Sequence, residues 1–178
     1  MIRSVKRSVV LLSVLAAGSL GVAGVLVGCS SSVPAAGHSA AAVLSGYNAE
    51  NISEATQTNS FGGYSISATS RTVTAYRTAA ATSDDLSAVE GVGLPAGFSL
   101  RIKAVQRSWT MLERLEERLP SRLPSSLKPL LSEVDIDAQA NGLDVGLTSV
   151  SPSSKANLRK VLGGSLAKVF RADRVTAS

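Results

Sequence analysis

The clearest element of the fold is predicted by residues 134–147, which read VDIDAQANGLDVGL. Asn141-Gly142 is the preferred dipeptide for a two-residue hairpin turn, because both positions adopt positive φ readily. With that turn, Ala140 faces Leu143 and Ala138 faces Val145, while Ile136 faces Leu147. Since alternate residues of a strand share a face, the region Val134–Val150 is predicted to form an antiparallel hairpin with one apolar face.

Apolar periodicity places further elements around this hairpin. Phe98–Val105 alternates apolar and polar residues, as expected for a half-buried strand. Residues 64–78 favour strands with a break near Ser70-Arg71, and residues 84–90 favour a short helix. A helix over 109–119 is predicted to begin with a capping box at Thr110 and Glu113 and to stop at Pro120. A last helix begins at Ser151-Pro152 and is interrupted at Gly163-Gly164, with an apolar stripe formed by Leu158, Val161, Leu162, Leu166, Val169 and Phe170.

These elements together predict an α+β fold. The expected core is a small antiparallel sheet of about four strands, with two main helices packed on it. Aromatic residues are scarce, with one Trp, three Tyr and three Phe. The core must therefore be built mainly from Leu, Val, Ile and Ala.

The N-terminus has the pattern of an export signal. Arg3, Lys6 and Arg7 precede an almost wholly apolar run from Val9 to Val27, and a charged start followed by an apolar stretch is typical of a secretory signal. The run ends in Leu26-Val27-Gly28-Cys29, which resembles the lipobox of bacterial membrane lipoproteins. Cys29 is the only cysteine of the chain.

This resemblance implies a division of the chain into three parts. Residues 1–28 are the lipoprotein signal peptide, with cleavage after Gly28. Residues 29–45 hold the acylated Cys29, which carries a diacylglycerol-type lipid, and a flexible tether. Residues 46–178 form a single α+β domain. The implied location is the extracytoplasmic face of the cell membrane, or of the outer membrane if the host has one; the alternatives are a retained transmembrane helix and an ordinary secreted protein.

The charge balance argues against nucleic acid as a partner. The full chain has a formal net charge of +5, from 18 basic and 13 acidic residues. Removal of residues 1–28 takes away three basic and no acidic residues, which leaves +2. The excess positive charge belongs partly to the signal, and export separates the chain from nucleic acid.

A leucine-rich segment punctuated by Pro120, Pro124 and Pro129 follows the helix at 109–119. Its leucines have two interpretations. They anchor a connecting segment to the core, or they form an apolar binding rim for a lipid or partner. The candidate rim consists of Leu119, Leu123, Leu127, Leu130 and Leu131.

No catalytic or metal-binding set is recognised in the sequence, and we expect no cofactor other than the lipid. His38 is the only histidine and lies in the tether, with no acid or thiol beside it. Ser125-x-x-Lys128 matches one element of penicillin-binding enzymes, but the Lys-Thr-Gly element of those enzymes is missing. Asp135, Asp137 and Asp144 fall on one hairpin face and form either a Ca²⁺ site or, as we expect, a solvated strand face.

One further resemblance concerns residues 119–147. A Leu-Pro-rich segment followed by Val134-x-Ile136 and Gly142-Leu143-x-Val145-x-Leu147 is similar to the C-terminal end of the LmeA-like phospholipid-binding envelope proteins. This resemblance implies a curved sheet around a helix with an apolar groove for acyl chains.

The sequence thus favours a non-enzymatic, membrane-anchored lipoprotein that binds an envelope protein or a cell-wall component. The alternative is a lipid-binding or lipid-carrier module with an apolar groove. The basic C-terminal helix has two interpretations of its own: it packs on the sheet with a basic outer face, or it lies on an anionic membrane surface.

Overall fold

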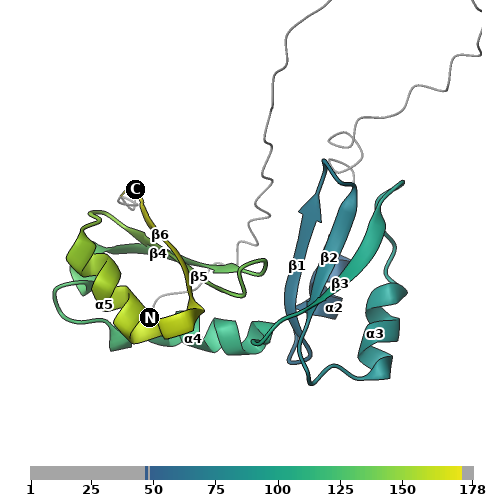
Figure 1. Cartoon of the computed structure of the whole chain (residues 1–178), viewed down its shortest axis with the longest axis horizontal. Coiled ribbons are helices and arrows are strands. Elements are labelled where there is room, and N and C mark those ends of the chain that lie inside the picture. Colours follow the sequence, from purple (N-terminus) through teal and green to yellow (C-terminus); the bar gives the residue numbers. More distant parts are fainter. Residues whose placement is uncertain (1–46, 48, 174–178) are drawn as a thin grey trace, which may run out of the picture.

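The computed structural model describes residues 47 and 49–173. The signal peptide, Gly28, Cys29 and His38 lie outside the described residues. Two consecutive units with the same order of elements follow one another along the chain (Figure 1). The N-terminal unit comprises α2 (Glu50–Thr56), β1 (Phe61–Ser67), β2 (Thr72–Arg77), α3 (Ser83–Glu90) and β3 (Ser99–Ala104).

The C-terminal unit repeats this order with longer helices. It comprises α4 (Trp109–Arg122), a 3₁₀ turn η1 (Lys128–Leu130), β4 (Leu131–Asp137), β5 (Gly142–Leu147), α5 (Pro152–Leu162), a second 3₁₀ turn η2 (Gly163–Ser165) and β6 (Leu166–Arg171).

The expected α+β class is confirmed, but the expected single antiparallel sheet of about four strands is wrong in both the number of sheets and the strand direction. Each unit has its own three-stranded mixed sheet, ordered β1-β2-β3 and β4-β5-β6. The first two strands of each sheet are antiparallel, whereas the third runs parallel to the second. The parallel pairing arises because α3 and α5 return the chain across the sheet before the last strand begins.

The two hairpins repeat each other at a spacing of 70 residues. β1 and β4 begin at residues 61 and 131, and β2 and β5 begin at residues 72 and 142. Arg71 and Asn141 hold the same turn position, with φ values of 48° and 53°. The amide of Thr78 donates to Ser60 O at 2.9 Å, and that of Thr148 donates to Leu130 O at 2.8 Å. The repeat therefore extends to single hydrogen bonds.

The predicted hairpin exists, but its turn is longer than two residues. Ile136, rather than Ala140, lies opposite Leu143, so residues 138–141 form the connection. The Asn141 amide closes it by donating to Ala138 O at 3.3 Å. The pairing moved by an even number of residues, and a strand has a side-chain period of two. The predicted apolar face was therefore preserved although the register was wrong.

The second half of the predicted C-terminal helix is a strand. α5 ends at Leu162, and Gly163 takes φ 56° and ψ −132° as the helix cap. Glycine adopts positive φ without a Cβ clash, so the chain leaves the helix there. Residues 166–171 then form β6, parallel to β5. The interruption predicted at Gly163-Gly164 is thus a change of secondary structure.

The helix predicted over 109–119 is longer and starts differently. α4 continues through Pro120 to Arg122. Its N-cap is Ser108, whose hydroxyl accepts the Met111 amide at 3.3 Å, so the predicted capping box at Thr110 does not form. Proline lacks an amide hydrogen, but the ladder resumes after it, since the Leu123 amide donates to Leu119 O at 3.1 Å.

Each unit has its own cluster of buried apolar side chains. The N-terminal unit buries Ile52, Phe61, Val73, Ala75 and Val89 between its sheet and helices. The larger cluster of the C-terminal unit is dominated by leucine, as the composition predicts. Its members are Leu112, Leu119, Leu123, Leu127, Leu143, Val145, Leu147, Leu158 and Leu162.

Asn141 connects the turn of the C-terminal unit to the segment between the units. Its side-chain oxygen accepts the amides of Gln106 and Arg107, at 3.1 and 2.8 Å, and its Nδ2 donates to Arg107 O at 2.8 Å. Arg107 Nη1 in turn donates a hydrogen bond to the backbone oxygen of Asn141 at 3.2 Å. Asn141 is buried, so these bonds satisfy the polar atoms of a side chain that is shielded from water.

Two glycines of β1 allow this close approach. A Cβ on Gly62 would lie 2.7 Å from Arg107 O and 2.9 Å from Asn141 Nδ2. A Cβ on Gly63 would lie 2.8 Å from Trp109 Cε3. Larger residues at these positions would therefore force the two units apart.

We expect Asn141→Ala to lower the free energy of unfolding by about 2–4 kcal/mol, because it removes the three side-chain hydrogen bonds of a buried residue. Urea unfolding of the full-length protein measures this change. Arg71→Ala, at the equivalent turn position of the N-terminal unit, is the control and should cost less than about 1 kcal/mol. Asn141→Gly relieves the positive φ but also removes the bonds, so wild-type stability in that variant would contradict the assignment.

Candidate binding surface

The leucines of the candidate apolar rim lie in the core of the C-terminal unit. Leu119, Leu123 and Leu127 are buried, and Leu130 and Leu131 pack against the same cluster. These leucines anchor the connecting segment to the core, which is one of the two interpretations that the sequence left open. They do not form an exposed rim in this structure.

The aspartates of the hairpin lie together on the face of the sheet opposite the core. Asp135 on β4 is directly opposite Asp144 on β5. The pKa of Asp144 is raised, first because burial penalises its charged form, then by the negative charge of Asp137, while Lys168 acts in the opposite direction. Asp144 Oδ1 is buried without a hydrogen-bond partner. Among the described residues, no group of three or more acidic, His or Cys side chains could hold a metal ion.

The Ser83-Asp84-Asp85 segment has a structural role at the start of α3. The Asp85 carboxylate accepts the Thr82 amide at 2.8 Å and the Ser60 hydroxyl at 2.9 Å. The pKa of Asp85 is lowered, with the hydrogen bond from the Thr82 backbone as the largest cause. The bond between the Asp85 carboxylate and the Thr82 amide is part of a capping box. The Asp85 carboxylate therefore serves to cap α3.

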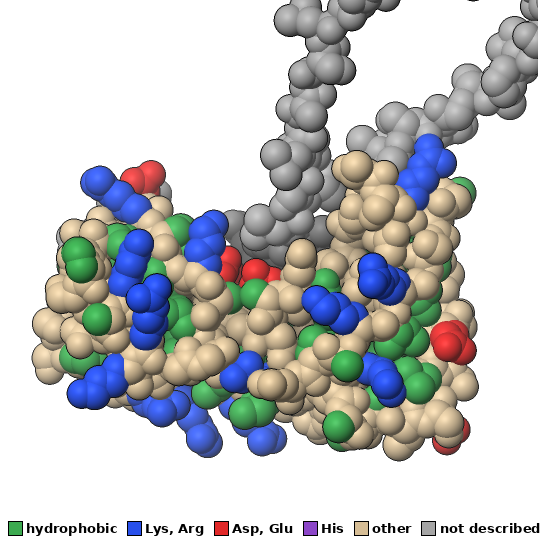
Figure 2. All heavy atoms as spheres, in the orientation of Figure 1, with side chains coloured by type: hydrophobic (Ala, Val, Ile, Leu, Met, Phe, Trp, Pro, Cys, Tyr) green, Lys and Arg blue, Asp and Glu red, His purple; other side chains and the backbone are tan. Residues whose placement is uncertain are grey.

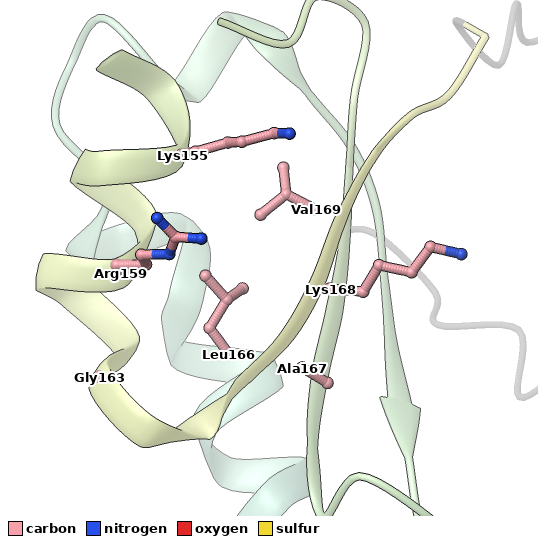
Figure 3. A pocket seen from close by; sticks show the side chains of 7 residues that line it. All are labelled: Lys155, Arg159, Gly163, Leu166, Ala167, Lys168 and Val169. Atoms are coloured by element: carbon pink, nitrogen blue, oxygen red, sulfur yellow. The ribbon is translucent and has the colours of Figure 1, made fainter. Parts of the chain in front are cut away.

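An open depression of about 380 Å³ lies between α5 and β6. Figure 3 shows Lys155 and Arg159 extending from α5 toward β6, while Leu166 and Val169 extend from β6 toward α5. Lys168 projects to the other side of the strand (Figure 3). The depression therefore has a cationic helix wall and an apolar floor.

The residues that line this depression include no Asp or Glu. Residues 145–172 carry five basic side chains and no Asp or Glu. Lys155 and Arg159 are one helical turn apart and exposed, and neither side chain has a hydrogen bond or ion pair with another described residue. Blue side chains lie over this part of the molecule in Figure 2. The depression is thus suited to an anionic group.

The equivalent helix of the N-terminal unit has the opposite charge. α3 carries Asp84, Asp85 and Glu90 and no basic residue, whereas α5 carries Lys155, Arg159 and Lys160 and no acidic residue. Because the two helices hold the same place in the repeat, the basic surface is a property of the C-terminal unit alone.

The sequence identified the basic residues of this surface but not their arrangement. Lys168 and Arg171 were expected on the same helix as Lys155, and they lie on β6. Gly163-Gly164 and the following alternation Ala167-Lys168-Val169 were the available signals for a strand.

No known family model, curated protein or solved structure matches the chain. Within the described residues, no helix is both long enough and apolar enough to cross a membrane.

The pKa shifts of Asp144 and Asp85 predict opposite effects of pH on stability. A carboxyl whose pKa is raised on folding destabilises the folded protein when it ionises. A carboxyl whose pKa is lowered on folding stabilises the folded protein above its unfolded pKa of about 4. At neutral pH, Asp144→Asn should therefore raise the free energy of unfolding and Asp85→Asn should lower it. Both differences should shrink as the pH falls to about 3. Urea unfolding across this range is the measurement, and effects of equal sign would contradict the prediction.

Proposed function

We propose that this chain is a membrane-anchored, non-enzymatic binding module of the cell envelope, whose partner is an envelope protein or a cell-wall component. The anchor is a lipid on Cys29, placed by the resemblance of Leu26-Val27-Gly28-Cys29 to a lipobox. The binding surface is the depression between α5 and β6. The location that follows is the extracytoplasmic face of the membrane.

The observation that carries this proposal is the pair of exposed cations, Lys155 and Arg159, in a depression whose lining residues include no Asp or Glu. Exposed cations above an apolar floor supply attraction to anionic groups and some apolar contact area. Neither side chain forms a hydrogen bond or ion pair with another described residue. The surface is therefore available for a partner without loss of internal bonds.

The lipid-carrier alternative has less support. It requires an apolar groove lined by the leucines between Leu119 and Leu131, and three of these five side chains are buried in the core. The depression between α5 and β6 is small and open. A partner that keeps its charged groups in the depression and its bulk outside fits this shape better than an enclosed acyl chain.

The anchor predicts the behaviour of Cys29→Ala. In the producing bacterium, this variant should no longer incorporate an alkyne-labelled fatty acid, and less of it should be recovered in the membrane fraction. Ser30→Ala, one residue along the tether, is the matched control and should keep both the label and the membrane fraction. Intact mass of the purified chains checks cleavage before residue 29. Unchanged labelling and membrane recovery in Cys29→Ala would contradict the proposal.

A further inference from the structure

Among the described residues, β6 is the last strand of its sheet and has one backbone edge without a paired strand. The sheet order β4-β5-β6 gives β6 a single neighbour. The Ala172 amide donates to Leu147 O at 2.9 Å, which fixes the direction of the alternating amides. The backbone N–H and C=O groups of one residue point to the same side of a strand, and those of the next residue point to the opposite side. The N–H and C=O groups of Val169 and Arg171 therefore face the free edge.

The depression described above lies along this same edge. Four consecutive residues of β6, Leu166 to Val169, line it together with Lys155 and Arg159. Lys168 stands on the other face of the strand (Figure 3). An added strand would therefore have Lys155 and Arg159 on one face and, on the other, Lys168, which is in register with Asp144 of β5. Lysine on an edge strand also discourages pairing between identical edges.

The equivalent edge of the N-terminal unit provides an internal comparison. β3 is also a terminal strand of its sheet and carries Arg101 and Lys103. The neighbouring helix is the acidic α3, so an anionic segment would meet opposing charges there. Of these two edges, that of β6 has the basic helix beside it, and it is the one that favours an acidic partner.

We propose that the free edge of β6 accepts an extended acidic peptide segment of a partner protein as an added strand, with its carboxylates beside Lys155 and Arg159. Main-chain hydrogen bonds to Val169 and Arg171 would supply affinity, and the cations would supply selectivity. A lipid headgroup could use the cations but has no use for the strand edge, so the observations favour a peptide. This inference rests on the proposed binding function and names the chemistry of its partner.

The test uses full-length protein in uncharged detergent and a fluorescent octapeptide of alternating Glu and Val. Lys155→Ala/Arg159→Ala should weaken binding roughly 2- to 30-fold, measured by fluorescence anisotropy. Arg114→Ala/Arg118→Ala is the matched control, because it removes two exposed arginines at the same spacing from α4. Equal loss in both variants would reduce the interaction to net charge and overturn the proposal.

A second probe separates strand addition from charge attraction. The same octapeptide methylated at every backbone amide keeps its carboxylates but cannot donate main-chain hydrogen bonds. It should bind about 10-fold more weakly or worse. Equal affinity of the two peptides would overturn the proposal, as would stronger competition by phosphatidylglycerol vesicles than by the unmethylated peptide.

The strand edge is tested directly at Arg171. Arg171→Pro and Arg171→Ala remove the same exposed charge, but only proline removes the outward amide. The proline variant should bind the octapeptide more weakly than the alanine variant, with thermal unfolding confirming that both are folded. Equal binding by two folded variants would overturn the proposal. Intact mass reports acylation in the same samples, so acylated protein that fails to bind peptide contradicts this inference and leaves the proposed anchor standing.

Discussion

The hydrogen bonds between Asn141 and residues 106–107 are the interaction on which the arrangement of the two units depends. Each unit has its own sheet and its own apolar cluster, so apolar burial within the units does not fix their relative position. An amide side chain both donates and accepts, and here it satisfies two backbone amides and one carbonyl at once. The glycines at 62 and 63 allow the backbones to approach closely enough for these bonds to form.

The repeat of 70 residues separates the features that the two units share from those in which they differ. Both hairpins keep the same bulge, turn and closing threonine, because these features are set by backbone geometry. The exposed faces of α3 and α5 are not constrained in this way and differ in charge. The two units therefore share a scaffold and present different surfaces, and of the equivalent edges of β3 and β6 it is that of β6 that lies beside a basic helix.

Sequence reasoning recovered the elements whose signal is local. The short helix at 84–90, the strand at 98–105 and the apolar face of the hairpin all agree with the structure within a residue or two. The repeat was missed because few residues are identical at a spacing of 70; Ile66 and Ile136, Ala68 and Ala138, and Thr78 and Thr148 are the pairs within the hairpins. The hydrogen bonds of the Asn141 side chain were also not predicted, since a favourable turn dipeptide does not reveal what its side chain contacts.

The sequence by itself determined the α+β class, the apolar faces and the basic character of the C-terminal region, because periodicity and composition act over a few neighbouring residues. Only the tertiary structure decided that residues 166–171 form a strand and that the leucines from 119 to 127 are buried. The physical reason is that an apolar stripe fits either a helix or a strand until its partner is known. In this protein the partner is β5, which holds β6 parallel to it and leaves the outer edge of β6 free.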